Sequence, residues 1–270
     1  MPVTPAHAAL ALPLSRAAPA LPLAPLVIGT LSPDFEYLLW LSPTGRFAHS
    51  LVGLVVFCVP VTLLVWGMWR AIVRPAFERL VPPGMAAMMS EGARGAPRSV
   101  AALACVGALA ALLGALSHVA WDAFTHANGW AVAHLPVLRG EASLGWPLGV
   151  RWYRLLQHAS SVVGMAAIVA WGASRVASVP RPARVFAPGQ AARSLGVALA
   201  LLGVAAGTGT LNALRASSDR LPTVLGFAAV GAMAGLVLAS LVYGVLARPA
   251  RSRWVRVERG LNGRRASAGD

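Results

Sequence analysis

The chain has 270 residues, of which 57% are hydrophobic and only 12% are charged. A soluble domain is about a quarter charged, so this composition excludes an ordinary soluble or disordered protein and favours a polytopic membrane protein in a lipid bilayer. The net charge is +14, and all 23 basic residues are arginine. Because no basic stretch is interleaved with aromatic residues, we expect no nucleic-acid partner and interpret the charge as loop charge that orients membrane helices.

Apolar runs define the expected elements in chain order. The first segment, 21–41, contains Pro22, Pro25 and Pro33 and two acidic residues, so we expect a short interfacial or re-entrant helix there. Five later runs are long enough to span a bilayer, which takes about 20 helical residues. They cover residues 51–69, 99–121, 155–174, 194–214 and 221–247. The sequence therefore predicts an all-α, multi-pass transmembrane helical bundle with about five spanning helices.

Arginines concentrate in alternate connecting segments, and seven of them follow residue 247. Cytoplasmic loops carry such an excess, so we expect a plasma-membrane protein with its N-terminus outside and its C-terminus in the cytoplasm. No basic region precedes a short apolar segment at the start, so we expect no cleaved signal peptide. We divide the chain into residues 1–175 with a candidate site, 176–247 with two scaffold helices, and a basic tail, 248–270.

The two cysteines, Cys58 and Cys105, both lie inside apolar runs. We expect each to behave as a small buried hydrophobic residue. Their number and spacing exclude a disulfide framework and argue against a cysteine-based metal site, which needs closely paired cysteines.

Histidine and aspartate residues gather at one end of the first three runs. His49 precedes the first run, His118 and Asp122 end the second, His126 follows, and His158 lies near the start of the third. Residues 118, 122 and 126 are spaced by four, which places them on one helix face. Two imidazoles and a carboxylate suit zinc, manganese or iron(II). The alternative is that these groups cap or brace a helix end by hydrogen bonds.

Two further residues have both a functional and an ordinary interpretation. Asp34 follows Ser-Pro in a turn and is either a metal ligand or an N-cap for the next segment. His7 lies near the start of the chain, where a single histidine is usually solvated. By the same reasoning, His49 is either a ligand or a residue of the membrane interface.

Several motifs of the chain resemble the DUF4184 family of bacterial membrane proteins over residues 1 to about 175. They are the opening Met-Pro-Val-Thr-Pro-Ala-His, the run Leu-Val-Ile-Gly-Thr-Leu-Ser-Pro-Asp, the step Ala-His-Ser-Leu, the run Ser-His-x-x-x-Asp-x-x-Thr-His, and Leu-Gln-His. The chain is more distantly similar to the YdjM-type membrane-bound metal-dependent hydrolases. The order of its His and Asp residues is similar to that of zinc-dependent phospholipase C.

The resemblance implies a divalent metal ion, zinc first and manganese or iron as alternatives. The implied ligands are His7, Asp34, His49, His118, Asp122 and His126, with His158 as a further site residue. The soluble phospholipases also use an N-terminal Trp and a later His-x-x-x-Glu pair. Neither is present here, so the sequence does not predict a full three-metal site.

Three functions remain open from the sequence. The first is a metal-dependent hydrolase at the extracytoplasmic membrane face, acting on a phosphoester or lipid-like substrate. Arg139, Arg151 and Arg154 would then contact phosphate, or they are ordinary loop arginines. The second is a proton or cation relay or transporter, which needs ionisable groups throughout the membrane depth. The third is a noncatalytic membrane protein with a structural His/Asp site. Protein partners are not indicated.

Overall fold

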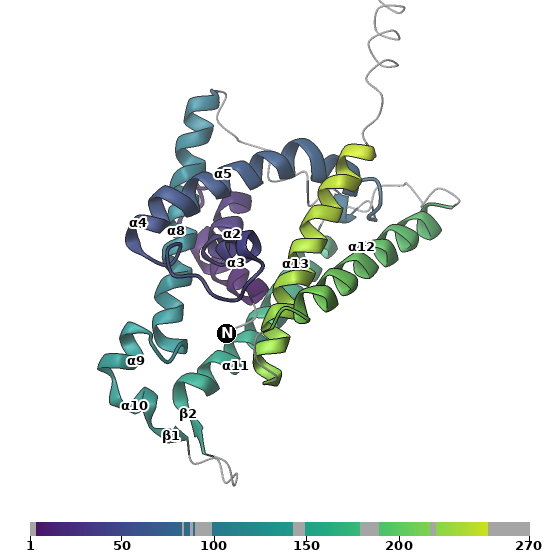
Figure 1. Ribbon diagram of the computed structural model, residues 1–270. Coiled ribbons are helices and arrows are strands. Elements are labelled where there is room, and N and C mark those ends of the chain that lie inside the picture. The colour runs from purple at the N-terminus through teal and green to yellow at the C-terminus, as the bar shows by residue number, and fades with distance from the viewer. Residues whose placement is uncertain are drawn as a thin grey trace, which may run out of the picture.

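The computed structural model describes residues 4–82, 84–86, 89, 99–142, 149–178, 189–216 and 220–247, so the basic tail lies outside the described residues. Within them the regular structure is helical except for a small antiparallel hairpin (Figure 1). Its strands, β1 (Glu141–Ala142) and β2 (Val150–Arg151), have two residues each. The predicted all-α class is confirmed.

In the described part of the chain, five helical stretches are long and apolar enough to cross a membrane, as predicted. They are Leu51–Phe77, Val100–His134, Trp152–Ser178, Gln190–Ala213 and Leu221–Leu246. At most 28% of the most apolar window of any stretch is buried inside the protein. So much outward-facing apolar surface needs a lipid environment, and the protein is therefore a membrane protein.

The first long stretch is irregular. It consists of α4 (Leu51–Gly53), a π-helical turn η3 (Leu54–Cys58), α5 (Val59–Met68), a second π-helical turn η4 (Trp69–Val73) and α6 (Arg74–Phe77). Each wide turn directly precedes a segment with proline at its second position, where the ring removes a backbone donor. The expected end at residue 69 was too early, because Arg70 and Arg74 end the apolar run but not the helix.

Short helices of the N-terminal segment pack inside the bundle. They are η1 (Thr4–Leu10), α1 (Ala11–Ala17), α2 (Leu23–Leu31), η2 (Ser32–Asp34) and α3 (Phe35–Trp40). The segment expected at 21–41 is thus three consecutive helical pieces. In Figure 1, α2 and α3 lie between α8 (Val100–Thr125) and α13 (Leu221–Leu246). The main contacts are those of α2 with α8 and of η1 with α11 (Trp152–Ser178).

Helices α2 and α8 approach each other closely because small residues face each other. A Cβ atom on Gly29 would lie 2.5 Å from the Ala111 carbonyl oxygen, and one on Gly114 would lie 2.7 Å from the Thr30 nitrogen. Small residues allow such backbone contact between membrane helices. The contact places the end of α2 beside the last turns of α8.

The remaining elements extend from this core. Helices α9 (Trp130–His134) and α10 (Pro136–Arg139) follow α8 and lead to the hairpin and α11. Helix α12 (Gln190–Ala213) packs along α13. Of the two cysteines, Cys58 is buried but Cys105 is exposed. The expectation for Cys105 was wrong, because the lipid-facing side of a membrane helix is as apolar as its buried side.

Candidate metal centre

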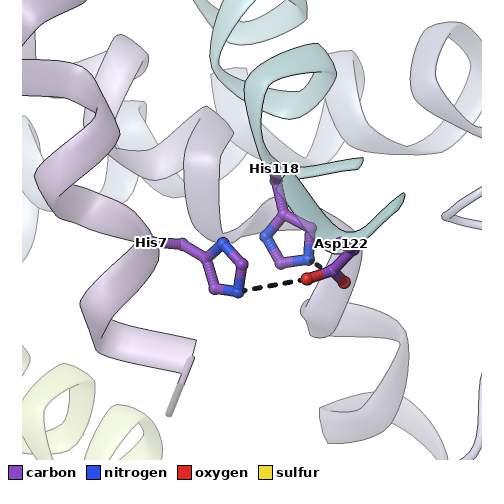
Figure 2. A group of neighbouring side chains, drawn as sticks. All are labelled: His7, His118 and Asp122. Atoms are coloured by element: carbon purple, nitrogen blue, oxygen red, sulfur yellow. Dashed lines mark ion pairs between the residues drawn. The ribbon is translucent and has the colours of Figure 1, made fainter. Parts of the chain in front are cut away.

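Six side chains converge near the C-terminal end of α8, and they are the six that the sequence and its family resemblance indicated. His7 comes from η1 and Asp34 from η2. His49 lies in the turn just before α4. His118 and Asp122 lie on α8, with His126 directly after it. Figure 2 shows His7 facing the two α8 residues from a different segment. His7 and Asp34 are each 3% exposed and His118 is fully buried.

Asp122 lies between two pairs of histidines. Its Oδ1 is 3.5 Å from His7 Nε2 and 3.3 Å from His126 Nδ1. Its Oδ2 is 3.2 Å from His118 Nε2 and 3.8 Å from His49 Nε2. The two oxygens of one carboxylate therefore face different imidazoles.

Asp34 completes one side of the cluster. Its Oδ1 lies 3.5 Å from His49 Nε2 and 3.7 Å from His118 Nε2. Its other oxygen, Oδ2, accepts a hydrogen bond of 2.6 Å from Thr4 Oγ1. Thr4 thus occupies one oxygen and leaves the other for the centre of the cluster.

The orientation of His118 follows from the close packing of α2 on α8. Its Nδ1 lies 2.7 Å from the Thr30 carbonyl oxygen. A carbonyl only accepts, so Nδ1 carries the proton and donates, and Nε2 is left as the ligand atom. Backbone carbonyls commonly hold metal-binding histidines in this way.

The segment before His49 is anchored on both sides. The backbone nitrogen of Ala48 donates to Glu36 Oε2 at 2.9 Å, and its carbonyl accepts from the Cys58 thiol at 3.4 Å. The ring of Tyr37 stacks on His49 with centroids 5.9 Å apart. These contacts explain how a residue outside a helix is held in the cluster.

The protonation states of the N-terminal groups suit metal binding, which requires neutral imidazole and ionised carboxylate. Burial, helped by the nearby His118, lowers the pKa of His7 to about 4. Burial alone would raise the pKa of Asp34, but the close approach of His49 and the proximity of His118 lower it to about 2. Burial and neighbouring carboxylates raise the pKa of Tyr37, so its hydroxyl keeps its proton.

Several buried atoms of the cluster have no hydrogen-bond partner among the residues that the structure describes. They are His7 Nδ1, Asp34 Oδ1, His49 Nδ1 and Nε2, His118 Nε2, Asp122 Oδ1 and His126 Nε2. An unsatisfied buried polar group costs about 1–3 kcal/mol, so hydrogen bonding alone leaves the cluster unfavourable. Two sets of three side chains have ligand atoms within 4.8 Å of one another: His7, His118 and Asp122, and Asp34, His49 and His118. The residues therefore fit a divalent metal ion.

A cavity of about 350 Å³ opens beside the cluster. It is lined by His49, Asp122 and His126, together with Tyr37 and Arg46 and with residues after α8. One side of the cluster is therefore accessible to a small molecule. Catalytic metal sites need such an open side, whereas structural sites are closed.

The other residues indicated by the sequence lie elsewhere. His158 is exposed on α11, and its neighbour Gln157 is buried instead. His158 belongs to neither set of close ligand atoms. The three arginines proposed as phosphate contacts are exposed and do not line the cavity; they are Arg139, Arg151 and Arg154.

Sequence reasoning missed four polar residues around the cluster: Thr4, Glu36, Tyr37 and Arg46. Glu36 carried a usable signal, since it is an acidic residue in an apolar segment two positions after Asp34. Arg46 also stands out, as the arginine nearest to His49 in the sequence. The other two have no local signal, because their roles come from contacts with distant segments.

One comparison with known proteins shows the family. The family model described as a domain of unknown function, DUF4184, matches residues 1–245. Nothing among the curated proteins or the solved structures matches the chain. The family match continues through α12 and most of α13, beyond the residues that carried the resemblance in the sequence. The chain belongs to the DUF4184 family.

Proposed function

We propose that this protein is a membrane-bound hydrolase that depends on a divalent metal ion, with zinc as the first candidate. The observation that carries the proposal is the set of buried, unpaired His and Asp atoms beside an accessible cavity. The ligands would be His7, Asp34, His49, His118, Asp122 and His126. Mixed nitrogen and oxygen donors suit zinc, and manganese and iron(II) also accept them.

The arrangement of Asp122 favours a centre with room for two ions. Its Oδ2 faces His118 and His49, which also contact Asp34. Its Oδ1 faces His7 and His126. His118 belongs to both close sets of ligands, but only its Nε2 is free to bind a metal. It can therefore be a ligand of one ion only. A shared Asp122 carboxylate would join the two groups.

A bound divalent ion would polarise a phosphoryl or carbonyl oxygen and make water more acidic. The protein's own residues would supply the setting for this chemistry. Asp34 and His118, both buried, exclude bulk water from the back of the centre. The Tyr37 hydroxyl stays protonated and would donate a hydrogen bond to a substrate oxygen in the cavity that it lines.

Exposed tryptophans on α3 and α9 support a position of the centre at the membrane surface. Trp40 and Trp130 are 67% and 69% exposed, and Trp130 lines the cavity. Exposed tryptophans favour the membrane–water interface. The arginine distribution would place this surface outside the cell. A reporter protein that is active only in the cytoplasm should be active when it is fused after residue 247. A translocated reporter would contradict that orientation.

A relay or transporter is the second candidate, and one observation counts against it. The His and Asp groups of the described residues gather at one end of the long helices. Helix α13 has no acidic, basic or histidine side chain, and α12 has only Arg193, in its first turn. A relay would need such groups along the membrane depth.

Metal analysis of the detergent-purified chain tests the proposal. We expect stoichiometric metal by mass spectrometry in the wild type and in His158→Ala, a control that removes an exposed histidine. We expect its loss in a folded Asp122→Ala variant, because Asp122 contacts four histidines. Hydrolysis of phosphoesters that a chelator abolishes and metal restores would support catalysis. A wild type without metal, even after reconstitution, would contradict the proposal.

A further inference from the structure

One wall of the cavity beside the cluster carries a positive charge that the metal site does not use. Arg46, in the segment between α3 and α4, lines the cavity together with His49 and Asp122. Among the described residues that line the cavity, it is the one lysine or arginine. It is exposed, and no acidic side chain within the described part of the chain forms an ion pair with it.

The segment that carries Arg46 is held in place. Glu36 accepts the Ala48 N–H through Oε2, and the same oxygen would lie 2.7 Å from a Cβ atom on Gly45. Glycine at 45 therefore lets the backbone lie directly against the Glu36 carboxylate. Arg46 thus lies between two residues whose backbones contact Glu36. Its backbone position relative to the cluster is set by the fold.

The shape and charge of the cavity suit a small anionic group. Its volume of about 350 Å³ accommodates a headgroup-sized molecule. A bound divalent ion would already offset the charge of the two aspartates of the cluster, and Arg46 then makes this side of the site positive. A guanidinium group presents paired donors that match the oxygens of a phosphoryl group.

We propose that Arg46 binds the phosphoryl group of the substrate, so that the substrates are phosphate esters. This inference rests on the proposed metal-dependent function and names its substrate class. The phosphate is held between Arg46 and the metal ligands His49 and Asp122, which line the same cavity. Arg46 replaces Arg139, Arg151 and Arg154 as the phosphate contact, because only Arg46 lines that cavity.

The test measures binding of inorganic phosphate to the purified, manganese-loaded full chain, from the broadening of its phosphorus NMR signal. The variants are Arg46→Gln, Arg46→Lys and a control, Arg16→Gln, which removes an exposed arginine of α1. We expect Arg46→Gln to weaken phosphate binding about tenfold, the usual scale for a charge-assisted contact. Arg46→Lys should lie between it and the wild type, and Arg16→Gln should match the wild type.

Metal content, measured on the same samples, separates the two ideas. Full metal content with unchanged phosphate binding in Arg46→Gln would overturn the inference and leave the proposed function intact. A metal-loaded wild type that binds no phosphate would do the same. A wild type that binds no metal would overturn both.

A second arm identifies the source of the phosphate ester. The chain is placed in nanodiscs of phosphatidylcholine, with or without phosphatidic acid, and the phosphate measurement is repeated. If phosphatidic acid competes with phosphate in the wild type and not in Arg46→Gln, the substrate is supported as a lipid headgroup. Phosphate binding that is unaffected by phosphatidic acid would support a soluble ester.

Discussion

The two halves of this protein use similar apolar helices in different ways. Around α2 and α8 the interior holds the buried side chains of His7, Asp34 and His118. Along α12 and α13 many large apolar side chains face outward, and Asn212 is the one buried polar residue of these two helices, both of which the structure describes. Both regions therefore have the apolar composition and the close packing of membrane helices, and the buried histidine and aspartate side chains are what distinguish the region of the candidate site.

The largest expected effect comes from the same substitution made in both halves. Gly114→Ala places a methyl group against the Leu26 carbonyl and the Thr30 nitrogen, both backbone atoms. We expect it to destabilise the fold by about 1–3 kcal/mol and to lower metal content, because it moves Thr30 from His118. Gly203→Ala, in α12, has nothing within 4 Å and should be neutral or stabilising by up to about 1 kcal/mol. Thermal unfolding and metal analysis measure the effects of both substitutions. Equal effects would contradict the assigned role of the α2–α8 contact in positioning the site.

A smaller effect is expected from removing one hydroxyl. Thr4→Val keeps the shape of the side chain but loses the hydrogen bond to Asp34 Oδ2. Groups that orient metal ligands typically contribute about 10–100-fold to metal affinity, and we expect a loss of that size. Thr210→Val, which removes a hydroxyl that bonds within α12, is the matched control. Titration with a competing chelator measures both, and equal affinity in Thr4→Val and wild type would argue against the ligand role of Asp34.

The smallest effect concerns the link between the halves. Asn212 Nδ2 donates to the carbonyl of Leu41 at 3.0 Å and to that of Phe227 at 2.7 Å. Leu41 has a left-handed backbone with φ of 47°, which large residues rarely adopt. Asn212→Leu should lower stability by about 1 kcal/mol, since each such bond in a membrane contributes about 0.6 kcal/mol. Metal content should stay unchanged, and its loss would show that the halves are coupled.

The long helices could be predicted from sequence because lipid imposes a simple rule on their composition. The ends of α12 and α13 lie within a few residues of the expected ones. The first long helix ran further than expected, because a helix continues past arginines that reach the interface. The short helices from η1 to α3 could not be predicted in this way, because their bounds depend on packing against α8 and α11.

The candidate site was predictable where the signal was local. The spacing of His118, Asp122 and His126 placed them on one face, and the structure has both histidines within 3.3 Å of Asp122. The contacts that orient them were not predictable, because Thr30 is 88 residues from His118 in sequence. His158 shows a further limit: one residue is a rotation of about 100° on a helix, and Gln157 is the buried neighbour.

The position of η1 has a consequence for biosynthesis. Thr4 and His7 are made long before α8 and α11, between which η1 is packed, with Gly164 of α11 giving room for the Ala6 carbonyl. Nascent chains emerge in order, so the earliest part of the site waits for more than half of the protein to be synthesised. Completion of the ligand set is therefore a late event in membrane assembly. A ribosome stalled before residue 152 would display α8 without the partner that holds His7 in place.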